Sequence, residues 1–227
     1  MYKELARGLI VSCQAAEGEV FHGLDLMRYM ARAAESGGAV GIRALAEEIP
    51  SIKQVTDLPV IGLVKKKYSD SDVYITPTRR EVDILLKTGC DVIALDATLR
   101  SRPQKETVEG LVSYIKSCAP DIRIMADCDC LESALAADSI GFDYVGTTMR
   151  GYTEKTQGIN IPDYAFLKEL RKSLRSAKLI AEGGIWEVSQ LEKVLECDPY
   201  AVVIGTAITR PADITARFAK IITEKRG

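Results

Sequence analysis

The sequence predicts an α/β fold, a (β/α)8 TIM barrel, on three observations. Eight short apolar runs alternate along the chain with segments whose apolar residues recur at helical spacing. Near-continuous apolar runs are typical of strands in a parallel sheet with both faces buried. The chain has 227 residues, the length of one such barrel, and no low-complexity linker divides it. We therefore expect a single (β/α)8 barrel catalytic domain over residues 1–227.

The predicted strands are the apolar runs, and the predicted helices are the amphipathic segments between them. The strand-like runs are Leu9–Cys13, Ala39–Ile42, Val60–Val64, Val92–Leu95, Ile122–Ala126, Tyr144–Gly146, Leu179–Ala181 and Val202–Ile204. The helix-like segments are Leu24–Ala34, Val82–Leu86, Val108–Ile115, Leu131–Ile140, Tyr164–Leu174, Val188–Leu195 and a closing tail from Ile214 to Ile222. A doubly wound open sheet is the alternative, but it would usually carry a glycine-rich fingerprint after its first strand. Here Gln14 follows that strand without a glycine turn, which favours the barrel.

Composition and charge exclude several classes of protein. Hydrophobic residues make up 47% of the chain and charged residues 27%, as in an ordinary globular protein. A net charge of −2 gives no electrostatic reason to bind nucleic acid or an anionic membrane. No apolar run approaches the ~20 residues that span a bilayer, and the N-terminus lacks a secretory pattern. We expect a cytoplasmic protein with reduced cysteines, and we predict no metal site because zinc-type spacing is absent.

Polar residues at the predicted strand ends mark the expected active site, because barrel active sites form at the carboxyl ends of the strands. In chain order these tips are Gln14, Arg43, Lys65 with Lys66 and Lys67, Asp96, Asp127, Thr147 with Thr148, Glu182, and Thr206 to Arg210. No tip carries a histidine, which leaves lysine and a carboxylate as the candidates for acid–base chemistry. Simpler interpretations remain open: the aspartates could cap helices, Arg43 could be a solvated charge at a helix start, and the lysines an exposed loop.

Two glycine turns near the C-terminus indicate an anion-binding site. Gly183 and Gly184 follow the seventh predicted strand, and Gly205 with Thr206 follows the eighth. Barrel proteins often bind phosphate on the loops after the last two strands. Glycine lets backbone N–H groups approach an anion closely, and Arg210 could add a charged contact. The glycines could simply make tight turns, but two in tandem beside an arginine favour a phosphate site.

Nine motifs at or near the strand ends, spread over nearly the whole chain, form a recognisable combination. They are GLIVSCQA (Gly8–Ala15), GAVGIRA (Gly38–Ala44), PVIGLVK (Pro59–Lys65), VYITPT (Val73–Thr78), VIALDAT (Val92–Thr98), IMAD (Ile124–Asp127), GTTMRGYT (Gly146–Thr153), IAEGG (Ile180–Gly184) and VVIGTAITRP (Val202–Pro211). This combination resembles the N-acetylmannosamine-6-phosphate 2-epimerase family. The resemblance implies a barrel like those that bind ribulose phosphate, and interconversion of N-acetylmannosamine 6-phosphate and N-acetylglucosamine 6-phosphate in sialic acid catabolism. It implies no metal or organic cofactor.

The same resemblance implies roles for individual residues. Lys65 would be the catalytic acid/base, and Glu182 its carboxylate partner. The residues that would orient the sugar are Gln14, Arg43, Asp127 and Thr147, and those that would bind the phosphate are Gly183, Gly184, Gly205, Thr206 and Arg210. The chain departs from the family pattern at Cys128–Asp129–Cys130, at Thr206 where a second glycine is common, and at Gly184 where a larger residue often follows.

Epimerisation beside a carbonyl requires removal of the α-proton and its return to the opposite face, through an enolate. A lysine with its ordinary pKa of about 10.4 is a poor base, so the site must favour the neutral amine; burial and Arg43 would do so. Three alternatives stay open: a class I aldolase with a Schiff-base lysine, a sugar-phosphate sensor without turnover, and another phosphosugar isomerase. In each case the partner is a small sugar phosphate, and a homodimer is left open.

Overall fold

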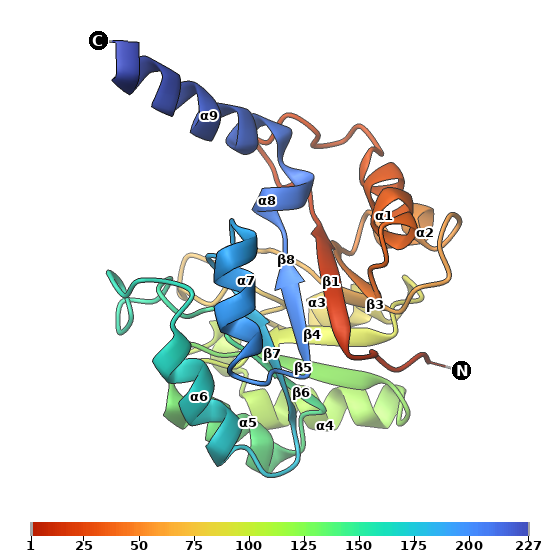
Figure 1. Cartoon of the computed structure of the whole chain (residues 1–227). Coiled ribbons are helices and arrows are strands. Elements are labelled where there is room, and N and C mark those ends of the chain that lie inside the picture. The colour runs from red at the N-terminus through yellow and green to blue at the C-terminus, as the bar shows by residue number, and fades with distance from the viewer. Residues whose placement is uncertain (1, 227) are drawn as a thin grey trace.

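The computed structural model describes residues 2–226 and contains a closed barrel of eight parallel strands with helices around it (Figure 1). The strands are β1 (Gly8–Cys13), β2 (Gly41–Leu45), β3 (Val60–Leu63), β4 (Val92–Asp96), β5 (Arg123–Asp127), β6 (Tyr144–Gly146), β7 (Lys178–Glu182) and β8 (Ala201–Ile204). Each strand pairs in parallel with the next, and Ile10 of β1 lies opposite both Gly41 of β2 and Val203 of β8. The predicted (β/α)8 barrel is confirmed.

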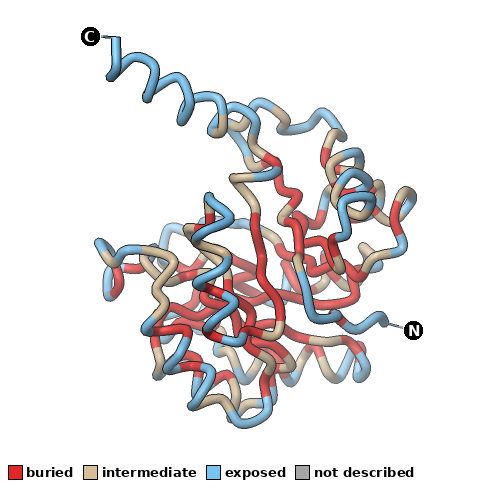
Figure 2. Tube along the Cα trace, in the orientation of Figure 1, coloured by how far each residue is buried: buried red, intermediate tan, exposed pale blue. Residues whose placement is uncertain are grey.

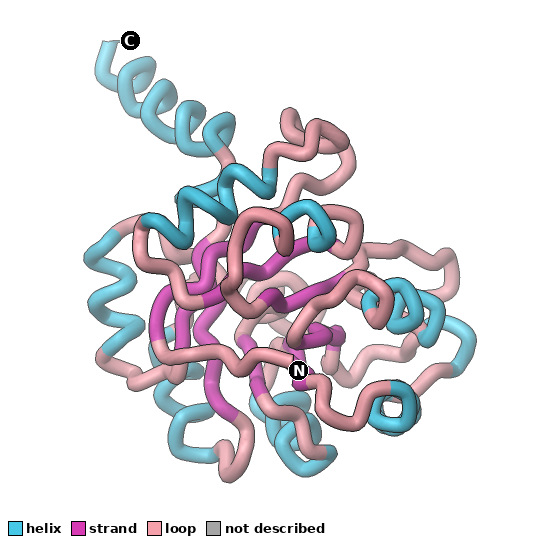
Figure 3. Tube along the Cα trace, turned by 90° about the vertical axis from the view of Figure 1, so that its right-hand side faces the viewer, coloured by secondary structure: helices cyan, strands magenta, loops and turns pink. Residues whose placement is uncertain are grey.

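Helices follow the strands on the outside of the barrel, as Figure 3 shows from a second side. They are α1 (Met27–Ser36), α2 (Ile49–Ile52), α3 (Arg79–Leu85), the 3-10 helix η1 (Pro103–Lys105), α4 (Val108–Cys118), α5 (Leu131–Ile140), α6 (Tyr164–Ser173), α7 (Val188–Leu195), α8 (Thr206–Thr209) and α9 (Pro211–Arg226). Local chemistry sets several of their ends. Thr78 and Glu81 form a reciprocal capping box at the start of α3. Helix α1 starts at Met27, later than predicted, because Asp25 adopts a left-handed φ of 51°.

The core has two parts, one inside the barrel and one between the strands and the helices. Figure 2 shows that buried residues are concentrated along the strands. Side chains alternate along a strand, so residues two apart face the same side. Met125 and Ile180 belong to the cluster inside the barrel, so Asp127 and Glu182, two positions further on, also face inward. The alternation therefore places these charged side chains inside the barrel at the carboxyl ends of the strands, where the pocket lies.

The predicted position of the second strand was wrong. The second strand was placed at Ala39–Ile42, with Arg43 beyond its end, but β2 runs from Gly41 to Leu45 with Arg43 in its middle. The helix predicted in the tail, Ile214–Ile222, lies within α9, which projects from the body and buries none of its residues (Figures 1 and 2). Within residues 2–226, none of the helices combines the length and hydropathy needed to cross a membrane.

Candidate active site

A cavity of about 500 Å³ opens at the carboxyl ends of the strands. Its wall contains nine of the eleven predicted site residues: Gln14, Arg43, Lys65, Glu182, Gly183, Gly184, Gly205, Thr206 and Arg210. The other two lie directly behind it. Asp127 holds Arg43 from below, and the Thr147 hydroxyl exchanges hydrogen bonds with the backbone N–H and C=O of Glu182. The structure therefore brings the predicted residues together in one place, and their chemical roles remain predictions.

A buried ion pair forms the floor of this cavity. Two nitrogens of the Arg43 guanidinium donate to the two carboxylate oxygens of Asp127, at 3.0 and 2.7 Å. Both side chains are fully inside, and forked pairing of this kind is the strong form of an arginine–carboxylate contact. Burial opposes the charge on Arg43, but Asp127 and Glu182 raise its pKa. The interpretations of Arg43 as a solvated charge and of Asp127 as a helix cap were wrong.

Glu182, the last residue of β7, lies beside this ion pair. Its Oε2 is 3.4 Å from an Arg43 nitrogen and 3.1 Å from the hydroxyl oxygen of Thr148. Burial raises the pKa of the Glu182 carboxyl; Arg43 opposes this, and the negative charge of Asp127 adds to it. Glu182 therefore retains a proton to higher pH than an ordinary glutamate.

Lys65 stands two residues beyond the end of β3, and its backbone forms an isolated bridge with Ile75. The pKa of its amine is lowered, mainly by partial burial and to a smaller extent by the positive charges of Arg43 and Arg210. The residue is exposed at the open mouth of the cavity, so solvent screening limits this shift. Of the three consecutive lysines, Lys65 lines the cavity, and the two that follow are exposed and lie outside its wall.

The two glycine turns form one side of the cavity. Gly183 and Gly184 adopt φ values of 110° and 72°, conformations that glycine allows without strain. A Cβ atom on Gly184 would lie 2.5 Å from the backbone carbonyl of Ile161, so a side chain does not fit there. Arg210 points into the same region, where its guanidinium pairs with Glu19 at 2.6 Å. An anion bound here would share Arg210 with that carboxylate.

Gln14 offers a hydrogen-bond acceptor to a ligand. Its side-chain nitrogen donates to the Ser12 hydroxyl at 2.8 Å, while its buried Oε1 has no hydrogen-bond partner among the described residues. A buried acceptor without a partner costs free energy, and a ligand donor would remove that cost.

Other lining residues of the cavity were not singled out as binding residues from the sequence, among them Tyr74, Thr148, Tyr152, Trp186 and Gln190. Thr148 was noted only as a neighbour of Thr147, and Tyr74 only as part of a motif. Tyr74 and Tyr152 come from segments between strands and helices, which a search of strand tips does not reach. Trp186, the single tryptophan of the chain, follows the glycine turn after β7.

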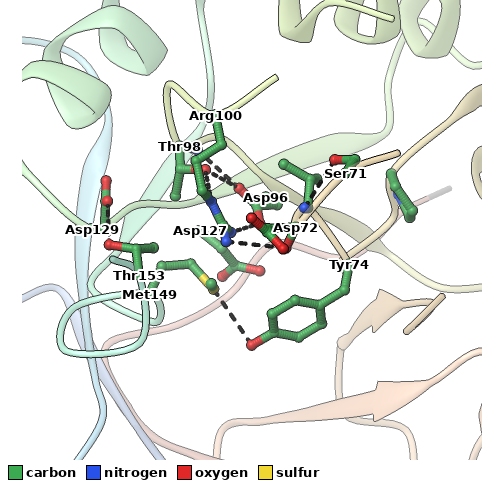
Figure 4. A network of polar contacts seen from close by, with 12 residues as sticks. Ser71, Asp72, Tyr74, Asp96, Thr98, Arg100, Asp127, Asp129, Met149 and Thr153 are labelled. Atoms are coloured by element: carbon green, nitrogen blue, oxygen red, sulfur yellow. Dashed lines mark hydrogen bonds and ion pairs between the residues drawn. The ribbon is translucent and has the colours of Figure 1, made fainter. Parts of the chain in front are cut away.

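The tip residue Asp96 takes part in a different network, on the β4 side of the barrel mouth (Figure 4). Its carboxylate accepts hydrogen bonds from Thr98 and from Arg100, which also donates to the backbone of Asp72. Tyr74 lies between this network and the cavity, and its hydroxyl donates to the sulfur of Met149 at 3.8 Å. Asp96 thus holds the loop after β4 in place through Thr98 and Arg100.

Fold and pocket together define a (β/α)8 barrel protein with a polar ligand site at the carboxyl ends of its strands. In the described part of the chain, no group of three or more His, Cys, Asp or Glu side chains is placed to hold a metal ion. The chain matches the model of the NanE family, described as "Putative N-acetylmannosamine-6-phosphate epimerase", over residues 27–224. It belongs to this family.

Two relatives match it over nearly their full lengths. One, from Staphylococcus aureus (strain Newman), is named "Putative N-acetylmannosamine-6-phosphate 2-epimerase"; it is 50% identical over 223 residues, covering 97% of this chain and 100% of the relative. The solved structure of the N-acetylmannosamine-6-phosphate 2-epimerase from Clostridium perfringens is 46% identical, with a TM-score of 0.91 over 96% of this chain and 94% of that one. A thiamine phosphate pyrophosphorylase from Pyrococcus furiosus, 20% identical with a TM-score of 0.63, shares the fold.

Proposed function

We propose that this protein is an epimerase that interconverts N-acetylmannosamine 6-phosphate and N-acetylglucosamine 6-phosphate by removing and returning the proton at C2. The observation that carries the proposal is a single cavity that joins Lys65, Glu182 and Arg43 with two glycine turns. The names of the family and of both full-length relatives agree with it. The reaction belongs to sialic acid catabolism, and a single barrel domain in the cytoplasm carries it out.

The arrangement supports proton transfer by two different groups. A lowered pKa makes the Lys65 amine available as a base, and a raised pKa makes the Glu182 carboxyl available as an acid. No ion pair joins Lys65 to Glu182 within residues 2–226, and their mutual electrostatic effect is smaller than the effects of burial and of Arg43 on each pKa. Arg43 supplies fixed positive charge beside the enolate that forms when the proton leaves C2. Gln14 orients the open-chain sugar through its free acceptor.

The phosphate of the substrate lies against the glycine turns at the end of β7 and β8. Their backbone N–H groups and the guanidinium of Arg210 supply the donors, and Glu19 gives up part of its contact with Arg210 when the phosphate binds. Crystals soaked in sulfate test this arrangement directly. Sulfate at Arg43, with none at the glycine turns, would contradict it.

The activity is tested by adding N-acetylmannosamine 6-phosphate in deuterated water and following the reaction by NMR. The expected result is the gluco epimer with deuterium at C2, in part or in full. Complete epimerisation without deuterium over repeated turnovers would contradict exchange with solvent. Binding without conversion would instead indicate a sensor, and a covalent adduct trapped by borohydride would indicate a Schiff-base aldolase.

Two copies of the chain associate as a homodimer in this proposal. Helix α9 supports it, because Phe218, Ile221 and Ile222 are more than half exposed on a helix that buries none of its residues. Sedimentation at several protein concentrations should give a dimer, and Phe218→Ser should shift the equilibrium towards the monomer. A monomer at all concentrations in the unchanged protein would contradict the association.

A further inference from the structure

A single hydroxyl group, that of Thr148, lies between two carboxyl groups at the floor of the cavity. Its Oγ1 is 2.6 Å from Oδ1 of Asp127 and 3.1 Å from Oε2 of Glu182. A hydroxyl has one proton to donate, and an ionised carboxylate can only accept. Thr148 therefore cannot donate to both. The shorter contact has the length of a hydrogen bond to a charged acceptor, so the proton of Thr148 points to Asp127.

Arg43 does not donate a close hydrogen bond to Oε2 of Glu182. Two nitrogens of its guanidinium donate to Asp127 at 3.0 and 2.7 Å, whereas its nearest approach to Glu182 is 3.4 Å. An ionised Glu182 would face the lone pairs of Thr148 with no proton between the two oxygens, close to the charge of Asp127. A protonated Glu182 removes this conflict, because its Oε2–H donates to Thr148, which in turn donates to Asp127. Each donor in such a chain polarises the next one.

We infer that Thr148 is a positioning residue that holds Glu182 as a neutral carboxylic acid in the ligand-free enzyme, through the hydrogen-bond chain Glu182–Thr148–Asp127. Burial and the charge of Asp127, which raise the pKa of Glu182 against the opposing effect of Arg43, agree with this geometry. The resting site then pairs a neutral acid with the Lys65 amine of lowered pKa.

The consequence for catalysis rests on the proposed function. When Lys65 takes the proton from C2, the C2–H bond breaks and the electron pair moves to the carbonyl oxygen. The proton of Glu182 transfers to that oxygen, and the enolate becomes an enol. The enol proton then returns to the Glu182 carboxylate, and the Lys65 ammonium gives its proton to C2 after the intermediate has turned its other face towards Lys65, which completes the epimerisation. Thr148 then donates to Asp127 throughout and returns Glu182 to its neutral form.

Infrared difference spectra test the protonation state without any substrate. The spectrum of the unchanged protein minus that of Glu182→Gln at neutral pH should show the C=O stretch of a protonated carboxyl. Thr148→Val keeps the shape of the side chain but removes the acceptor, so this band should disappear at lower pH than in the unchanged protein. Thr148→Ser should restore the original titration. Thr153→Val is the matched control, since its buried hydroxyl donates to Asp129 at 2.7 Å and not to the cavity.

Two spectroscopic outcomes would overturn the inference. One is the absence of the Glu182 band in the unchanged protein at neutral pH. The other is a band that titrates at the same pH or a higher pH in Thr148→Val, which would mean that Thr148 donates to an ionised Glu182. In the epimerase assay, Thr148→Val should lower kcat by about 100-fold, the low end for loss of acid–base assistance, with KM little changed. If the protein does not turn over this substrate, the proposed function fails while the infrared result still decides the role of Thr148.

Discussion

Replacing Asp127 by alanine should destabilise the protein strongly, because it leaves the charge of Arg43 buried. Arg43 is 1% exposed and Asp127 is 0% exposed, so water cannot replace the missing carboxylate. Removal of one partner of a buried ion pair costs about 3–5 kcal/mol. Without the charge of Asp127, Glu182, 3.4 Å from Arg43, loses its proton more readily and compensates part of the charge, which places the expected loss at about 3 kcal/mol. For a chain of this length that corresponds to a fall in Tm of about 6–12 °C.

Urea unfolding followed by circular dichroism measures this loss, and a double variant separates charge from packing. Arg43→Met with Asp127→Leu removes both charges and fills the space with apolar side chains. Its stability should return to within about 1 kcal/mol of the unchanged protein, since apolar replacement of a buried pair is often neutral. The double variant should have no epimerase activity. An Asp127→Ala protein as stable as the original, or a double variant no more stable than Asp127→Ala, would refute the reasoning.

Three other changes have defined outcomes. Lys65→Ala should abolish epimerisation, whereas alanine at either of the next two lysines should not; the opposite result would place the base elsewhere in the run. Gly184→Ala should lower both Tm and phosphate affinity, since its Cβ would lie 2.5 Å from the Ile161 carbonyl. The control is Gly38→Ala, where φ is also positive but no atom lies within 4 Å, and equal effects at both sites would show strain alone. Burial raises the pKa of Glu48 to about 7 from 4.5, so its proton is bound more tightly in the folded chain. The free energy of unfolding should therefore fall as pH rises through this window, and Glu48→Gln should flatten the fall; an unchanged slope would contradict the assignment.

The strands and most of the site could be predicted because each is indicated by a short, continuous stretch of sequence. A strand buried on both faces appears as an apolar run, and the residue after the run is brought to the mouth of the barrel by the fold itself. Gln14, Lys65 and Glu182 were found in this way. Whether a predicted helix packs on the barrel is decided by tertiary contacts, so the helix in the tail could be predicted but not its projection from the body.

Pairings between distant residues could not be predicted. Arg43 was placed beyond its strand because a charged residue seems to end an apolar run. Its partner Asp127 lies 84 residues away, and that carboxylate is what makes a buried guanidinium tolerable within β2. Thr148 was missed for a similar reason: it lies 21 residues from Asp127 and 34 from Glu182, and the sequence does not show these two carboxyl groups to be neighbours.

The close approach of Gly184 to the main chain of Ile161 couples position 184 to the path of the segment before α6. In this chain a side chain at position 184 collides with the main chain of Ile161, so no choice of residue at 161 relieves the contact. A larger residue at position 184 would therefore require a different path for the segment before α6. Substitutions that move this segment would have to precede a larger residue at position 184. Because Ile161 lines the cavity, the same substitutions would also change the cavity wall. The shape of the ligand site therefore depends on two loops together, the turn after β7 and the segment before α6.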